Sequence, residues 1–176
     1  MRPAILGAIA STGFGRYYAD LVIYGANPGG LFAAMAARRL GLSAVVIHPR
    51  AHIGGMLTGG IYHTDIVTGY GKGTVKGLAD EFYRRLAVVE RKSQQRFMNG
   101  SSYGSSPMRV RNVLSQMLAE FGVYIITEER LVSVSKTDLR LTSIQTTGGV
   151  YEGATFIDAT YEGDLMAIAG ITTFIG

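Results

Sequence analysis

The chain has 176 residues, of which 47% are hydrophobic, and this is enough to build one substantial core. Its net charge of +4 is mild, and its basic residues are not interleaved with a run of aromatic residues, which argues against nucleic-acid binding. The absence of cysteine excludes a disulfide framework, a thiolate zinc site and a cysteine nucleophile.

Residues 1–19 are interpreted as a leader ahead of the first predicted strand. Arg2 precedes an apolar run over 4–10 that ends in small residues, which is typical of a short secretory signal. An unstructured leader is the alternative, so the location stays open between cytoplasmic and secreted. No stretch of the sequence is long enough to span a bilayer, and we therefore expect no transmembrane segment.

The next segment combines an apolar run, Asp20–Tyr24, with a glycine-rich turn, Gly25–Gly30, and an alanine-rich helix up to Leu40. A continuous apolar run is typical of a buried parallel strand. The free amides at the start of the following helix favour an anion, most often a dinucleotide pyrophosphate. The turn differs from the G-x-G-x-x-G fingerprint at one place, because Asn27 takes the middle position. An ordinary strand-to-helix turn is the alternative.

Each residue of this turn has an expected task. Gly25 allows the tight turn, and Gly30 lets the helix lie close to the strand. Asn27 is expected to tolerate a left-handed backbone, and Pro28 suits a first helical turn because it needs no amide there. The predicted cofactor-binding residues of the turn are Gly25, Ala26, Asn27, Pro28, Gly29 and Gly30.

A second buried strand is predicted over Ser43–His48, so that strand, helix and strand form one right-handed crossover. Nucleotide-binding folds usually place an acidic side chain about 20 residues after the glycines, where it binds the adenosine ribose. Here His48 takes that place and Arg50 follows it. Both are predicted to contact the cofactor. A neutral imidazole accepts only one hydrogen bond, and an arginine would suit a ribose 2′-phosphate, so NADP is a rival to FAD.

Two glycine pairs, Gly54–Gly55 and Gly59–Gly60, follow within a short span. They indicate a backbone that approaches a ligand closely, in a long structured loop rather than in a helix that leads to a third strand. This pattern argues against a simple nicotinamide-binding domain.

The histidines of this region are considered as metal ligands and as residues that line a reaction pocket. His48 and His52 are four residues apart, but Pro49 and Gly54 disfavour a helix between them, so no metal site is predicted. His63 and Asp65 are candidates for the lining of a reaction pocket, with a solvated loop as the alternative. No catalytic residue is assigned.

Two amphipathic helices are predicted in the middle of the chain. Apolar residues recur at helical spacing over 78–89 and again over 107–121, where Ser106 is the expected N-cap and Gly122 the expected stop. The serine-rich tract 101–106 is predicted to be a flexible linker or surface loop.

Short strands are predicted after Gly122, in the segments 123–127, 131–135, 139–146 and 150–151. Consecutive short strands joined by turns indicate a small antiparallel layer across the parallel sheet. The chain then returns to the parallel sheet over 154–160, followed by a short apolar helix. Asp158 is unusual in such a strand, because burying a carboxylate is costly unless it is paired or hydrogen-bonded.

Three patches resemble one known family, the FAD-dependent oxidoreductases of the two-dinucleotide-binding-domain type. They are Tyr-Gly-Ala-Asn-Pro-Gly-Gly over 24–30, His-Ile-Gly-Gly-Met-Leu-Thr-Gly-Gly over 52–60, and Phe-Ile-Asp-Ala-Thr-Tyr-Glu-Gly-Asp over 156–164. The resemblance implies a Rossmann-like FAD-binding domain over 20–176, of α/β class, with a central parallel sheet and a small antiparallel β layer.

The resemblance also implies roles for particular residues. The turn Gly25–Gly30 would hold the FAD pyrophosphate, and a loop with Gly54, Gly55 and Met56 would pass along the cofactor. A return segment would close the flavin-binding fold through Ala159, Thr160 and Asp164. The chain departs from the family at His48, where relatives have an acidic residue.

Relatives of this family are longer, and a later flavin-contacting segment and a substrate domain are expected to follow in them. We therefore interpret the chain as the amino-terminal part of an oxidoreductase in which FAD takes a hydride or electrons from a small-molecule substrate that the sequence does not identify. An NADP-binding dehydrogenase module and a degenerate, non-catalytic nucleotide-binding domain are the alternatives.

Overall fold

The computed structural model describes residues 7–9, 15–60, 75–91 and 105–172. It divides the chain into two compact units, one formed by 1–53 and 121–176 and the other by 54–120. Each unit is described by itself. The residues His63 and Asp65, and the tract 101–104, lie outside the described residues.

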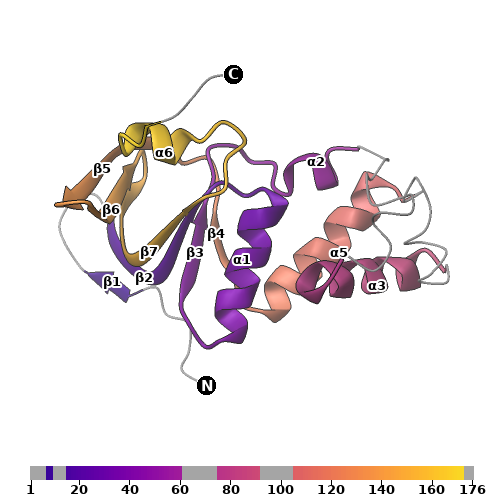
Figure 1. Cartoon of the computed structure of the whole chain (residues 1–176). Helices are drawn as coiled ribbons and strands as arrows, with labels where there is room; N and C mark the ends of the chain where they lie inside the picture. The colour runs from indigo at the N-terminus through magenta and orange to yellow at the C-terminus, as the bar shows by residue number, and fades with distance from the viewer. Residues whose placement is uncertain (1–6, 10–14, 61–74, 92–104, 173–176) are drawn as a thin grey trace. The chain divides into compact units, whose positions relative to one another are not determined.

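The first unit is built on one seven-stranded sheet with the strand order β4-β3-β2-β7-β6-β5, and β1 pairs with β2 (Figure 1). The strands β4, β3, β2 and β7 are mutually parallel, whereas β6, β5 and β1 join antiparallel. The fold class is therefore confirmed as α/β with a parallel centre. The strands are β1 Gly7–Ile9, β2 Gly15–Tyr24, β3 Ala44–Ile47, β4 Tyr124–Ile126, β5 Leu131–Thr137, β6 Arg140–Thr146 and β7 Gly149–Asp158.

The centre of this sheet is apolar on both faces, as the continuous apolar runs predict. Val22 and Val45 belong to a core cluster with Tyr151 and Leu165. Ile23 lies on the opposite face, where helix α1, Pro28–Arg39, packs against β2 and β3 (Figure 1). The sheet is thus buried on both sides along 21–24 of β2 and along β3, and this explains why these two segments are continuous apolar runs.

The first long strand begins earlier than the sequence indicates. β2 starts at Gly15 rather than at Asp20, and β1 pairs with its first half. Residues 15–19, which the sequence analysis places in the leader, therefore belong to the sheet. They extend as a strand because β7 offers a parallel partner from Gly149 onward.

The antiparallel part of the sheet also differs in detail from the prediction. β4 pairs in parallel with β3, so 124–126 belongs to the parallel centre and not to the antiparallel layer. The segments 150–151 and 154–158 form one continuous strand, β7, which pairs with β6 on one side and β2 on the other. The hairpin β5–β6 therefore continues the main sheet, and it is not laid across it as a second layer.

The second unit is helical over its described residues. It contains α2, Gly55–Thr58, α3, Gly77–Val89, and α5, Pro107–Glu120. The two longer helices, predicted from their apolar spacing, pack against each other through buried residues that include Phe82, Leu86 and Leu114. The expected N-cap is confirmed, because the Arg109 amide donates to Ser106 Oγ at 3.4 Å.

Candidate functional site

The glycine-rich turn lies at the carboxyl end of β2, between its neighbours β3 and β7. The Gly25 amide donates to the Ile47 carbonyl at 2.8 Å, and Gly25 has a φ of +109°. A Cβ placed on Gly25 would lie 2.7 Å from the Thr160 amide nitrogen and against the Ala159 backbone. Only glycine fits here, because both the left-handed backbone and the close approach of the β7 end exclude a side chain.

The first turn of α1 packs closely against Ala159, which follows the end of β7. A Cβ on Gly30 would lie 2.6 Å from the Ala159 Cβ and from the Gly25 carbonyl oxygen, which confirms the close packing expected of Gly30. By contrast, nothing lies within 4 Å of a Cβ placed on Gly29, which is exposed. Pro28 is the first residue of the helix, as expected.

The first turn of α1 is suited to an anion. The Leu31 amide donates to the Asn27 carbonyl at 3.0 Å, whereas the Gly29 and Gly30 amides have no partner among the described residues. The described helix carries no acidic residue in its first turn and no side-chain cap. Unpaired amides and the positive end of the helix dipole therefore face the same place, with no built-in negative charge competing for it.

Asn27 serves a purpose different from the one predicted. Its backbone is extended, with φ −77° and ψ 164°, so Asn27 does not adopt the left-handed conformation that asparagine tolerates. Its side-chain Nδ2 instead donates to the Ala159 carbonyl at 2.9 Å. The residue that replaces the middle glycine of the fingerprint thus ties the turn to the end of β7.

His48 follows β3 and its ring reaches the turn. The Ala26 amide donates to His48 Nδ1 at 3.2 Å. Burial lowers the pKa of His48 below its ordinary value, and the positive charges of Arg50 and His52 act in the same direction, against a hydrogen bond with the His52 backbone that raises it. Arg50 is exposed two residues further on. Burial at this position therefore disfavours the protonated imidazole.

The return segment after β7 is organised by Asp158. Its Oδ1 accepts from the Thr160 amide at 2.9 Å and from the Thr160 hydroxyl at 2.7 Å, and its Oδ2 accepts from the Met166 amide at 2.9 Å. These three bonds explain how a carboxylate is tolerated at the end of this strand. The sequence marks Asp158 as unusual in its strand, but no local pattern predicts these bonds.

The rest of this segment is anchored to the same elements. The Ala159 amide donates to the Tyr24 carbonyl at 2.8 Å, and the Thr160 hydroxyl accepts from the Asp164 amide at 2.9 Å. Asp164 is exposed at the start of α6, Asp164–Ile168, which follows the left-handed Gly163. The first and third sequence patches therefore come together in space through Ala159.

The second patch belongs to the helical unit from Gly54 onward. Gly54 has a φ of +91°, and a Cβ there would lie 2.6 Å from Thr58 Oγ1. The segment predicted as a loop without a helix contains one helical turn, α2, because the left-handed Gly54 allows the chain to close it. Gly55 begins α2 and Met56 is exposed on it. The positions of Gly54, Gly55 and Met56 are thus defined within their own unit.

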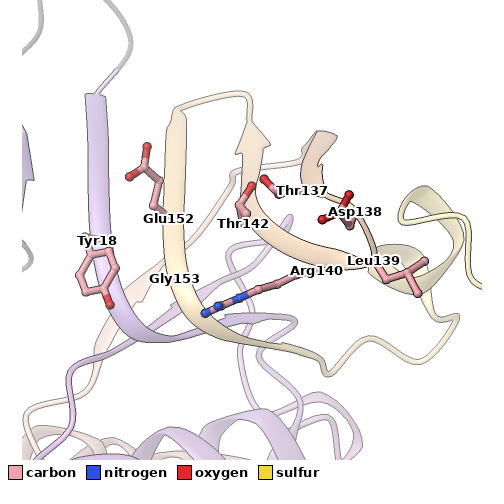
Figure 2. Close-up of a pocket in the computed structure, with 8 residues that line it drawn as sticks. All are labelled: Tyr18, Thr137, Asp138, Leu139, Arg140, Thr142, Glu152 and Gly153. Atoms are coloured by element: carbon pink, nitrogen blue, oxygen red, sulfur yellow. The ribbon is translucent and has the colours of Figure 1, made fainter.

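An open hollow of about 610 Å³ lies elsewhere in the first unit, at the β5–β6 turn and along β2 and β7 (Figure 2). Figure 2 shows Arg140 of β6 extending toward Gly153 of β7. None of the predicted site residues lines this hollow. Its lining consists of Tyr18, Thr137, Asp138, Leu139, Arg140, Thr142, Glu152 and Gly153.

Within the described ranges, no group of three or more histidine, aspartate or glutamate side chains is placed to hold a metal ion. Among the helices that the structure describes, none has the length and apolar character needed to cross a bilayer.

A glycine turn at the carboxyl end of a central parallel strand, followed by a helix with unpaired amides, defines the class of Rossmann-like nucleotide-binding proteins. Within this class, the chain belongs to the family of FAD dependent oxidoreductases, whose family model matches residues 20–176. Membership of this family implies FAD as the cofactor, and the family resemblance found in the sequence is confirmed. No curated protein matches the sequence.

Solved structures share the fold at low identity. L-proline dehydrogenase from P. horikoshii is similar over 90% of this chain and 57% of its own, with a TM-score of 0.66 and 14% identity. L-amino acid deaminase from Proteus vulgaris follows with 87% and 50% coverage, a TM-score of 0.59 and 14% identity. A flavin-containing monooxygenase from Stenotrophomonas maltophilia has a TM-score of 0.53 at 22% identity, covering 81% of this chain and 38% of its own. The chain thus spans little more than half of the first of these neighbours, and less of the others.

Proposed function

We propose that the turn Gly25–Gly30 binds the pyrophosphate of FAD, with the amides of Gly29 and Gly30 as donors. The unpaired state of these two amides is the observation that carries the proposal. The residues of the turn fit a pyrophosphate. Gly25 and Gly29 have no side chain that would fill the space, and the N-terminus of the helix adds the positive end of its dipole.

The remaining site residues are assigned around this anchor. From the family resemblance, we expect His48 and Arg50 on the adenosine side, and we expect Gly54, Gly55 and Met56 to pass along the cofactor. Ala159, Thr160 and Asp164 form the return segment, which Asp158 holds in place through three hydrogen bonds. Bound FAD supplies the redox chemistry by accepting a hydride or electrons, and this chain orients it.

The whole protein is an oxidoreductase acting on a small molecule, and this chain contributes its amino-terminal FAD-binding part. Support comes from the family match over 20–176 and from the length of the structural neighbours, of which the chain spans 57% or less. The flavin-contacting and substrate-binding segments that complete the site belong to the rest of such a protein.

Gly29→Asp tests the anion site without disturbing the fold. A carboxylate in the first turn of α1 interacts favourably with the helix dipole, so thermal stability should stay equal or rise. The same charge repels a diphosphate, and at about 5 Å in a partly screened site this weakens FAD binding by roughly tenfold or more. Fluorescence titration with FAD measures the affinity, and thermal unfolding without FAD measures the stability.

Gly29→Asn is the matched control, because it has nearly the same shape and no charge. Equal FAD affinity in Gly29→Asp and Gly29→Asn would contradict binding of the pyrophosphate at this turn.

Visible absorbance of the purified protein distinguishes FAD binding from the two alternative functions. An NADP-binding module, which Arg50 would suit, shows no flavin band. A chain that keeps neither cofactor when supplied with both is the degenerate domain.

A further inference from the structure

The backbone of His48 forms two hydrogen bonds, one with β4 and one with the segment that follows β4. Its amide donates to the Ile126 carbonyl at 2.8 Å, and its carbonyl accepts from the Glu129 amide at 3.1 Å. Its Nδ1 accepts the amide of Ala26, a residue with no exposed surface. The ring is therefore a fixed link between the β3 end and the second residue of the cofactor turn.

We propose that His48 is a positioning residue which orients the cofactor turn through the Ala26 amide, and that it does so only while its imidazole is neutral. This proposal rests on the function proposed above and concerns the regulation of the same site. It replaces the sequence-based expectation that His48 accepts a hydrogen bond from the adenosine ribose.

The chemistry of imidazole leads to this assignment. A neutral ring has one donor and one acceptor nitrogen, and the bond from Ala26 makes Nδ1 the acceptor, so the proton lies on Nε2. A ribose hydroxyl could use Nδ1 as an acceptor only by displacing the Ala26 amide. Protonation turns Nδ1 into a donor that faces another donor, and the buried Ala26 amide then loses its partner.

The surroundings keep the ring neutral. On its own segment, a hydrogen bond with the His52 backbone favours a positive ring, whereas the side chains of Arg50 and His52 both oppose it. From the β4 side, Glu129 faces it with its backbone amide, while its carboxylate accepts bonds from Tyr151 and Thr146. On the turn side, the positive end of α1 carries no acid in its first turn. The pKa of His48 accordingly lies below its ordinary value of 6.5, chiefly because of burial.

Nitrogen-15 NMR of the full chain without FAD tests the link directly. We expect His48 Nδ1 to resonate as an unprotonated nitrogen at neutral pH, and the Ala26 amide signal to titrate with the His48 ring, at a midpoint below 6.5. His52→Asn is the control for the neighbouring histidine, and it should leave this coupled titration in place. A protonated Nδ1 at neutral pH, or an Ala26 signal that ignores the His48 titration, overturns the proposal.

Two amide variants distinguish positioning from ribose binding. His48→Asn places an acceptor oxygen where Nδ1 lies, whereas His48→Gln places its amide near the position of Nε2. We expect His48→Asn to keep FAD affinity within about twofold and to remove its dependence on pH between about 5 and 8, and His48→Gln to bind about two- to tenfold more weakly.

The reverse ranking of the two variants indicates a ribose contact through Nε2 and overturns the proposal. If the unaltered chain binds no FAD at any pH, the proposed function fails, and the NMR titration still decides whether His48 orients the turn. The two failures are therefore distinguishable.

Discussion

At the scale of single residues, Tyr151 and Glu129 form a hydrogen bond in the interior of the sheet unit, outside the cofactor turn. The Tyr151 hydroxyl donates to Glu129 Oε2 at 2.9 Å, and Tyr151 is 1% exposed. Its ring stacks on Tyr17 with centroids 5.2 Å apart. Burial raises the pKa of Tyr151 well above its ordinary value of 10.0, and the Glu129 carboxylate raises it further, because both disfavour a phenolate.

The consequence is a loss of stability at alkaline pH. Because the folded chain keeps the Tyr151 proton to a higher pH than the unfolded chain, the contribution is complete below about pH 10 and declines above it. One proton corresponds to a slope of about 1.4 kcal/mol per pH unit. We predict that Tyr151→Phe reduces the slope of unfolding free energy against pH above about 10, measured by urea denaturation.

Tyr17→Phe is the matched control for this prediction, because it keeps the stacked rings and leaves the Tyr151 hydroxyl on Glu129. At neutral pH, Tyr151→Phe should also cost about 1–3 kcal/mol, since Glu129 loses one of its donors. An alkaline slope as steep in Tyr151→Phe as in the unaltered chain would show that the Tyr151 proton is not retained by the fold.

At the scale of elements, the strand β2, the turn and helix α1 show how far the sequence alone leads. The order of elements, the tight turn at Gly25, the packing glycine at Gly30 and Pro28 at the helix start were all predictable from local backbone requirements. The bond from Asn27 to Ala159 was not, because it joins residues 132 positions apart. The same applies to the bond between Ala26 and His48.

Asn27→Gly restores the fingerprint and should nonetheless destabilise the chain. Asn27 has a negative φ, so glycine relieves no strain there. The variant loses the bond to Ala159, worth about 0.5–1.5 kcal/mol, and adds about 0.5–1 kcal/mol of backbone entropy. Urea denaturation should therefore show a loss of about 1–2.5 kcal/mol. Asn27→Ala separates the two contributions, and a stabilised Asn27→Gly would show that the bond contributes nothing.

The sheet is a second feature that local sequence patterns predict only in part. The short runs after Gly122 were predictable as strands from their composition, but their partners were not. β4 pairs with β3, and β7 runs unbroken from Gly149 because β2 accompanies it on one side. Strand pairing depends on residues distant in sequence, so both the early start of β2 and the single sheet followed only from the structure.

At the scale of the whole molecule, the chain divides into two compact units, and each contains buried apolar side chains. The sheet unit buries Ile23, Val46 and their neighbours, whereas the unit 54–120 buries Leu114, Phe82 and Leu86 between its helices. Length and composition predict one α/β domain, and they carry no information on compact units within it, because both units are apolar inside. The cofactor turn and the return segment belong to the sheet unit.

Because the chain divides into two compact units, we expect the two units to differ in their free energy of local unfolding. Leu114 is fully buried in α5, and Leu114→Ala should destabilise its unit by about 2–5 kcal/mol through the cavity it leaves. Hydrogen exchange should then accelerate in α3 and α5, while the amides of β2 and β3 keep their protection. Ile23→Ala, a similar truncation in β2, should give the opposite pattern. An equal loss of protection everywhere in both variants would mean that the two units unfold as one, and the FAD site would then depend on the helical unit for its stability.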